Sequence, residues 1–245
     1  MNDGKGSIVA EDVSKVFFLE DKLSFVLENI NLDIKPGEFV ALLGPTGSGK
    51  TTLVNLLTGL YRPTSGRILV NGFDITKMRE DAVCEVRSNF LGIMFQNINL
   101  LPGLSIIENV ELPLLLRGKM GGHHRERALD LLKLVGLKEK MWNLPRQLSM
   151  GELRKAAIAR ALVTDPEILI LDEPTGDLDS LTIDELLILL RSLNILHRKT
   201  ILVTTHNPKV ATAARRRIVL QQRGRSNTWF STSETYRHTP SINLK

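Results

Sequence analysis

One segment near the start of the chain combines glycines with a lysine and hydroxyl groups at the spacing that binds phosphate. It consists of Gly44, Pro45, Thr46, Gly47, Ser48, Gly49, Lys50, Thr51 and Thr52. Because glycine has no Cβ, successive main-chain N–H groups can turn inward around phosphate oxygens. The helix expected from residue 51 to about 60 adds the positive end of its dipole. We therefore expect Lys50 to contact the β- and γ-phosphates of a nucleotide and Thr51 to bind Mg²⁺.

A second set of reactive side chains follows apolar runs farther along the chain. Residues 168–171 are apolar and are followed by Asp172 and Glu173. We expect Asp172 in the magnesium shell and Glu173, one residue farther out, to polarise an attacking water. By itself an Asp-Glu pair is equally typical of a helix cap, and Gln96 or His206 alone would be unremarkable. The phosphate loop makes the catalytic interpretation the better one.

The elements that must position these residues are short apolar strands. Residues 39–43, 168–171 and 201–204 are the length of strands buried on both faces of a parallel sheet. Each run ends in a polar tip, and ligands of open parallel sheets bind outside the carboxyl ends of the strands. Three such tips indicate one shared site. The first 35 residues suggest an antiparallel β layer, although their apolar and polar residues alternate imperfectly.

Residues 97–163 have a helical character instead. Ser105 with Glu108, and Ser149 with Glu152, have the spacing of capping boxes that open helices. Between them, residues 125–135 place apolar side chains on one face, with Gly136 at the expected stop. Pro113 predicts a kink or break in the first of these helices. The helix opened by Ser149 is expected to end near residues 165–166.

Composition places the chain among ordinary globular proteins. It has 245 residues, of which 42% are apolar and 24% charged, which excludes wholesale disorder and suits one α/β domain with an inserted subdomain. We find no apolar run of the roughly 18 residues that a membrane helix needs and no secretory signal, and the single cysteine, Cys84, fits a reducing compartment. We therefore expect a cytoplasmic protein. The net charge of +5 permits a polyanionic partner without requiring one.

The order of motifs resembles the ATP-binding subunit of an ABC transporter. The motifs are GPTGSGKTT, MFQ, QLSMGE, ILILDEPTGDLDS and VTTHN, and the resemblance covers residues 9–224. It is strongest to the lipoprotein-release, macrolide-efflux and cell-division branch. It implies an α/β P-loop NTPase fold, with a mostly parallel sheet core, an antiparallel β layer and an inserted helical subdomain. One domain would span residues 1–224, with its core at 1–96 and 164–224 and the subdomain at 97–163. After about Gly224 the chain is rich in Ser, Thr and Asn and has no periodicity, which predicts a loosely ordered tail at residues 225–245.

The resemblance also implies a homodimer that closes on ATP binding. Each ATP would lie between the phosphate loop of one copy and Ser149 and Gly151 of the other. In this arrangement Asp179 would cross the dimer interface. Ser149 at a helix N-cap, with the exposed backbone of Gly151 behind it, suits contact with a γ-phosphate.

Three further roles follow from the same resemblance. Gln96 would sense Mg²⁺ and the attacking water, and His206 would contact the γ-phosphate. Phe17 falls where the family has an aromatic residue that stacks on adenine. A phenylalanine in the core of the β layer is the alternative there, and the adjacent Phe18 means that the register could slip.

The chain departs from the family pattern in and near the helical signature. Met150 replaces a glycine, and Leu153-Arg154-Lys155 replaces glutamine-glutamine-arginine. Asn207 follows His206 where aspartate is commoner. Because Ser149, Gly151 and Glu152 remain, we expect a working clamp, with Met150 the change that most threatens its activity.

The expected function is that of an ATPase that powers a separate transmembrane permease for export or extraction of a substrate from the membrane. The permease would dock near residues 97–117 and hold the chain at the inner face of the cell membrane. The alternative is a mechanical or regulatory ABC ATPase partnered with a division-type membrane protein, without transport. No nucleic-acid partner is expected. The only sequence feature in favour of one is the basic run Arg215-Arg216-Arg217 with Arg223 and Arg225. The run could equally meet phosphate head groups of the inner leaflet, and a solvated surface explains it better than either.

Overall fold

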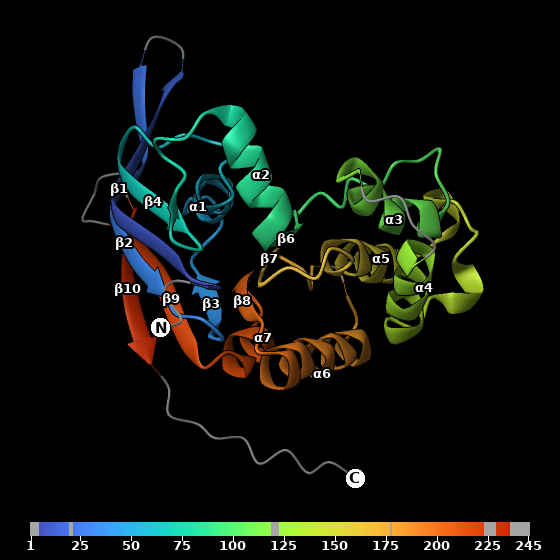
Figure 1. The fold of residues 1–245 in the computed structure, drawn as a ribbon. Helices are drawn as coiled ribbons and strands as arrows, with labels where there is room; N and C mark the ends of the chain where they lie inside the picture. The colour runs from blue at the N-terminus through green and yellow to red at the C-terminus, as the bar shows by residue number, and fades with distance from the viewer. Residues whose placement is uncertain (1–4, 20–21, 119–122, 177, 223–228, 236–245) are drawn as a thin grey trace.

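The computed structural model describes residues 5–19, 22–118, 123–176, 178–222 and 229–235. Its strands form two sheets, which Figure 1 shows on one side of the helical subdomain. The antiparallel sheet has the order β2-β1-β4-β5, and the larger sheet has the order β10-β9-β3-β8-β7-β6. The strands of the first are β1 (Ile8–Leu19), β2 (Lys22–Ile34), β4 (Ser65–Val70) and β5 (Phe73–Asp74). Those of the second are β3 (Phe39–Leu43), β6 (Leu91–Met94), β7 (Ile168–Asp172), β8 (Thr200–Thr204), β9 (Arg216–Gln222) and β10 (Trp229–Thr235).

The helices divide between the two sides of the large sheet and a separate lobe. They are α1 (Lys50–Leu57), α2 (Glu80–Phe90), α3 (Ile106–Leu116), α4 (His123–Leu134), α5 (Met150–Leu162), α6 (Ser180–His197) and α7 (Pro208–Ala213). Two short 3₁₀ turns, η1 (Lys138–Lys140) and η2 (Pro145–Gln147), precede α5. Among these described helices, none is both long enough and apolar enough to span a membrane.

The large sheet is buried on both faces, as its unbroken apolar runs predict. Side chains of successive strand residues point to opposite faces. Val40 and Leu42 therefore pack with α1 and the antiparallel sheet, whereas Phe39 and Ala41 pack with α5, α6 and α7. Helix α1 is thus enclosed between two sheets, and its N-terminus is fixed at the end of β3. The parallel core, the antiparallel layer and the inserted helices confirm the predicted fold class.

Helices α3, α4 and α5 enclose a third apolar cluster of their own. Ile107, Val110, Leu132 and Ala156 are completely buried in it. Pro113 lies inside α3, which continues to Leu116, so the prediction of a break there is wrong. A proline inside a helix costs about 3 kcal/mol, which the burial of apolar side chains on both sides of it offsets.

The chain after Gly224 also differs from expectation. Residues 229–235 form β10, which pairs antiparallel with β9 from Trp229 opposite Gln222 to Thr235 opposite Arg216. The loosely ordered tail predicted for 225–245 is therefore wrong for these seven residues, and its other residues lie outside the described part of the chain. The reason is that β9 pairs with β3 on one side and leaves the main-chain groups of its other edge for a further strand.

Candidate nucleotide site

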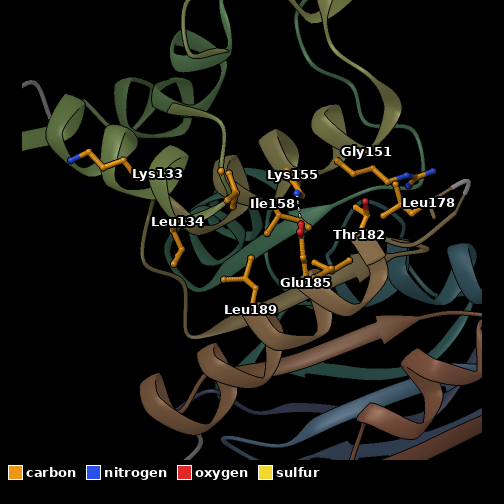
Figure 2. Close-up of a pocket in the computed structure, with 13 residues that line it drawn as sticks. Lys133, Leu134, Gly151, Lys155, Ile158, Leu178, Thr182, Glu185 and Leu189 are labelled. Carbon is orange, nitrogen blue, oxygen red and sulfur yellow. Dashed lines mark hydrogen bonds and ion pairs between the residues drawn. The ribbon is translucent and has the colours of Figure 1, made fainter. Parts of the chain in front are cut away.

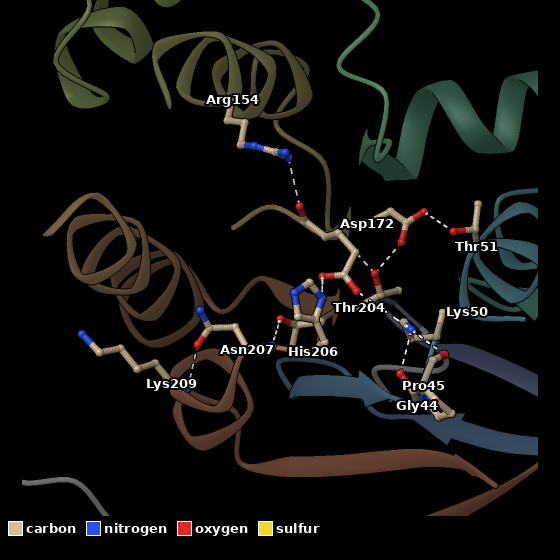
Figure 3. A network of polar contacts seen from close by, with 12 residues as sticks. Gly44, Pro45, Lys50, Thr51, Arg154, Asp172, Thr204, His206, Asn207 and Lys209 are labelled. Atoms are coloured by element: carbon tan, nitrogen blue, oxygen red, sulfur yellow. Dashed lines mark hydrogen bonds and ion pairs between the residues drawn. The ribbon is translucent and has the colours of Figure 1, made fainter. Parts of the chain in front are cut away.

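Three neighbouring strands bring the predicted reactive residues to one edge of the large sheet. β8 lies between β3 and β7 and is parallel to both. Their carboxyl ends therefore lie side by side, and the phosphate loop, Asp172 with Glu173, and His206 follow these ends directly. Figure 3 shows their side chains converging on one region.

The phosphate loop has a backbone that requires glycine at two positions. Gly47 and Gly49 have φ of 82° and 84°, in the left-handed region that L-residues rarely occupy. At Gly49, a Cβ would also lie 2.8 Å from the Leu27 side chain of β2. Beneath the loop, the hydroxyl of Ser48 is buried and has no hydrogen-bond partner among the described residues. An orphaned donor in this position suits a phosphate oxygen.

Lys50 begins α1 and points back into the loop. Its side chain is 9% exposed, and Nζ donates to the carbonyl oxygens of Gly44 at 2.8 Å and Pro45 at 3.2 Å. The same Nζ lies 4.0 Å from Oε1 of Glu173. The ammonium group therefore lies between the loop and the acidic end of β7, where a bound phosphate would need a cation.

Asp172 is joined to α1 and to β8 through both carboxylate oxygens. Oδ2 accepts a 2.9 Å hydrogen bond from the Thr51 hydroxyl, and Oδ1 accepts one from the Thr204 hydroxyl. The Asp172 side chain is completely buried. Two hydroxyl donors fix its orientation and satisfy the acceptor that burial would otherwise leave unpaired.

Glu173 has an unusual backbone conformation for a non-glycine residue. Its φ is 50°, which costs roughly 1–2 kcal/mol for a residue with a Cβ. Its N–H donates to the hydroxyl of Thr204 at 2.9 Å and to the carbonyl oxygen of Thr204 at 3.2 Å. Its carboxylate reaches the mouth of the site, where Oε2 lies 3.0 Å from Nδ1 of His206. Strained backbone held by its surroundings is typical of functional residues.

Most of these residues line one pocket of about 430 Å³, whereas Gly44, Pro45 and Asp172 lie outside its lining. Its lining includes six residues of the phosphate loop, residues 46–51, together with Thr52, Gln96, Glu173 and His206. Val26, Arg154 and Gly176 also line it, although the sequence predicts no role for them in the site. No signal in the sequence marks Val26 or Arg154. The alternation of apolar and polar residues in β2 does not distinguish Val26 from other residues on the same face, and an arginine on a helix is usually exposed to solvent.

Phe17 lies outside this lining. It is half-buried and packs edge-on against Tyr61, with ring centroids 5.8 Å apart and planes at 77°. Lys15 Nζ lies 5.0 Å from the centre of the Phe17 ring. Stacking of adenine on Phe17 therefore stays a prediction.

The signature residues also lie outside the nucleotide pocket of their own chain. Ser149 is the N-cap of α5, where its hydroxyl accepts from the N–H of Glu152 at 3.3 Å and Glu152 accepts from the N–H of Ser149 at 2.9 Å. A hydrogen bond from Lys140 lowers the pKa of Glu152 below its usual value. Gly151 lines a different cleft, and the Met150 side chain is 49% exposed. The capped end of α5 is thus presented to solvent.

Asp179 has a structural role that the sequence did not predict. It is the N-cap of α6 and accepts from the N–H groups of Leu181 and Thr182, each at 3.0 Å. The hydroxyl of Thr182 donates to it at 2.6 Å, and this bond is the main reason that the pKa of Asp179 lies below its usual value. Asp179 lies outside the nucleotide pocket, so its predicted position at an interface is untested.

Oxygen ligands for a magnesium ion are present in the pocket and directly beside it. Within the described residues, no group of three or more His, Cys, Asp or Glu side chains could hold a metal. The Thr51 hydroxyl and the Asp172 carboxylate lie together, and Gln96 lines the same pocket. Mg²⁺ prefers oxygen ligands and usually combines one or two protein groups with phosphate oxygens. The residues therefore fit a magnesium ion that arrives with a nucleotide.

Comparison with known proteins gives a consistent result. Residues 27–176 match the family model described as ABC transporter. The ABC transporter ATP-binding protein MJ0796 of Methanocaldococcus jannaschii is 41% identical over 218 residues, covering 87% of this chain and 93% of that protein. The macrolide export ATP-binding/permease protein MacB of Syntrophobacter fumaroxidans is 46% identical over 213 residues, covering 85% of this chain but only 30% of MacB.

Solved structures show the same similarity. The dimeric structure of MJ0796 superposes with a TM-score of 0.87 at 38% identity and covers 95% of this chain. A post-hydrolysis state of MJ0796 bound to ADP and Pi gives the same values. These findings confirm the predicted family and the predicted branch. The chain belongs to the ABC transporter family, as an ATP-binding domain with ATPase chemistry.

Proposed function

We propose that this chain binds ATP with Mg²⁺ in the pocket at the carboxyl ends of β3, β7 and β8. The observation that carries the proposal is that Lys50, Thr51, Glu173 and His206 line that pocket, while the buried carboxylate of Asp172 accepts a hydrogen bond from the Thr51 hydroxyl beside it. Lys50 and the loop N–H groups would bind the β- and γ-phosphates, and Thr51, Asp172 and Gln96 would hold the ion. A bound Mg²⁺ neutralises charge on the phosphates.

Glu173 is the group best placed to polarise the attacking water. Its carboxylate lies between the ammonium group of Lys50 and the ring of His206, at 4.0 Å and 3.0 Å. His206 is 73% exposed, so it can turn toward a γ-phosphate without opening the core. Hydrolysis would then depend on Glu173, and ATP binding chiefly on Lys50 and the loop.

Two copies of the chain would complete the site. Ser149 and Gly151 lie outside their own pocket at a solvent-exposed helix N-terminus, where one terminus contributes only about 0.3–1 kcal/mol toward an anion. Two such termini acting on two ATP molecules would make closure depend on the γ-phosphate. The dimeric structure of MJ0796 supports this arrangement. Asp179, at the start of α6, would lie near the same interface.

A separate membrane permease is the proposed partner. A groove of about 660 Å³ runs between α2, β6 and the end of α3, and its lining includes Leu91, Pro113, Leu116 and Arg117. Leu115 and Leu116, at the end of α3, are 47% and 79% exposed, so two neighbouring apolar side chains are available to a partner. The groove includes part of residues 97–117, where docking is predicted. MacB is by name an export protein that combines ATP-binding and permease parts, which supports an export role with a permease partner. That permease would hold the chain at the inner face of the membrane.

Purification of the chain from native membranes in mild detergent tests the partnership. We expect a stoichiometric membrane protein to copurify, and Leu116→Asp to abolish its recovery while ATP hydrolysis by the purified chain is retained. Leu196→Asp, at an equally exposed leucine on α6, is the matched control and should retain the partner. Recovery with nucleic acid and no membrane subunit would contradict the proposal, and a division regulator in place of a permease would favour the mechanical alternative.

A further inference from the structure

Arg154 lies where the helical lobe meets the nucleotide pocket. It is on α5, one turn after Gly151, and only 6% of it is exposed. Its side chain lines both the nucleotide pocket and the cleft of about 470 Å³ between α5 and α6 that Figure 2 shows. A buried guanidinium group is usually hydrogen-bonded to, or paired with, neighbouring polar groups.

One of those partners is the main chain of Glu173. Nη1 of Arg154 donates to the carbonyl oxygen of Glu173 at 3.0 Å, as Figure 3 shows. The same carbonyl accepts from the N–H of Gly176 at 3.3 Å. A Cβ added to Gly176 would lie 3.0 Å from Nη2 of Arg154, so the guanidinium packs directly over this turn. Arg154 and Gly176 together fix the peptide group that follows Glu173.

The peptide group on the other side of Glu173 is fixed by β8. Its N–H donates to the hydroxyl and the carbonyl oxygen of Thr204. Both peptide groups that flank the Cα of Glu173 are therefore anchored, and they hold its φ at 50°. Without one anchor this strained backbone would relax toward commoner conformations and move the carboxylate away from Lys50 and His206.

We propose that Arg154 is a positioning residue for hydrolysis, which holds the backbone of Glu173 from helix α5. The inference rests on the proposed function, in which Glu173 polarises the attacking water. Because α5 also begins with Ser149, Arg154 connects the end of the helix that would meet the partner's nucleotide to the glutamate of its own pocket. Displacement of α5 would thus be transmitted to Glu173.

The test is steady-state ATP hydrolysis by the full chain and its variants. We expect Arg154→Gln to lower kcat by about 10–100-fold, since a misplacement of about 1 Å in a reacting group has effects of that size. KM for ATP should stay within about threefold, because the contacts of Lys50 and Thr51 are intact. Arg154→Lys, which restores one donor, should recover part of the loss. Gly176→Ala, which displaces the guanidinium, should lower kcat in the same direction.

Lys155→Gln is the matched control, since it removes the neighbouring cation of α5, which pairs with Glu185 at 2.7 Å. It should change kcat by less than about twofold. If Arg154→Gln keeps the wild-type kcat, or raises KM with kcat unchanged, the inference is wrong. If Arg154→Gln does not fold, wild-type kcat in both Arg154→Lys and Gly176→Ala overturns it. Glu173→Gln separates the two claims: if that variant hydrolyses ATP at the wild-type rate, the proposed function fails whatever Arg154 does.

Discussion

Replacing Thr204 with valine should destabilise the whole domain, although the two side chains have nearly the same shape. Thr204 ends β8 and is completely buried. Its hydroxyl donates to Oδ1 of Asp172 and accepts from the N–H of Glu173 at 2.9 Å. Valine removes both bonds and leaves no room for water to replace them.

The expected loss follows from these two partners. A hydrogen bond to a carboxylate contributes about 1.5–3 kcal/mol, and Asp172 is completely buried. The N–H of Glu173 keeps its bond to the carbonyl oxygen of Thr204 at 3.2 Å, so the second loss is no more than about 1 kcal/mol. The free energy of unfolding should fall by about 2–4 kcal/mol. For a domain of this size Tm should fall by roughly 5–15 °C.

Thermal unfolding followed by circular dichroism measures this difference. Thr58→Val is the matched control, because Thr58 is also buried but its hydroxyl donates within helix α1, to the carbonyl oxygens of Val54 and Asn55. In this control the carbonyl oxygen of Val54 still accepts a hydrogen bond from the N–H of Thr58. The free energy of unfolding should therefore fall by about 1 kcal/mol or less. A Thr204→Val variant that melts with, or above, the control would refute the reasoning.

Three other predictions concern packing, charge and binding. Gly92→Ala should lower the free energy of unfolding by about 3 kcal/mol in denaturant titration, because its Cβ would overlap a main-chain oxygen of helix α5, whereas Gly103→Ala meets open space and should be neutral. The pKa of Glu152 is lowered by Lys140, so its carboxylate stabilises the fold above the unfolded pKa near 4.5. The Tm difference between wild type and Glu152→Gln should therefore vanish as pH falls through the lower, folded pKa, and a difference that persists at the most acidic pH would contradict this. Lys50→Met should raise Kd for a fluorescent ATP analogue by roughly 10–100-fold, and unchanged Kd would show that Lys50 does not bind phosphate.

The centre of the fold could be predicted from the sequence because its signals are local. The runs at 39–43, 168–171 and 201–204 are long enough and apolar enough to indicate buried strands, and the capping boxes of Ser105 and Ser149 are present as predicted. Most of the predicted site residues follow strands that the sheet places side by side. For them, position along the chain is nearly sufficient to give position in space.

Other elements depend on partners that are distant in the sequence. The pairing of β1 with β2 shifts register between Ala10 and Lys15, which breaks the alternation that would reveal two strands. Helix α2 buries only Val83 and Val86, so its apolar face is too narrow to predict. Strand β10 pairs with the open edge of β9, and the local sequence of β10 does not indicate that such an edge is available.

Arg154 shows the same limit within the site. An arginine on a helix is normally predicted to face solvent, and the sequence marked it only as a departure from the family pattern. It is buried because the turn from Glu173 to Gly176 packs over α5. That contact joins residues 19 or more positions apart and exists only in the folded chain.

The central claim is that two copies close around ATP and that Glu173 then permits its hydrolysis. Light scattering of Glu173→Gln with ATP and Mg²⁺ tests it most directly. This variant should bind ATP without hydrolysing it, so the closed dimer should persist. We predict that its mass rises from one chain to two with ATP and remains at one chain with ADP. Glu139→Gln, at an exposed glutamate of η1, should hydrolyse ATP and show no lasting dimer. A Glu173→Gln variant that remains a monomer at high protein and ATP concentration, or that hydrolyses ATP like the wild type, would contradict the account.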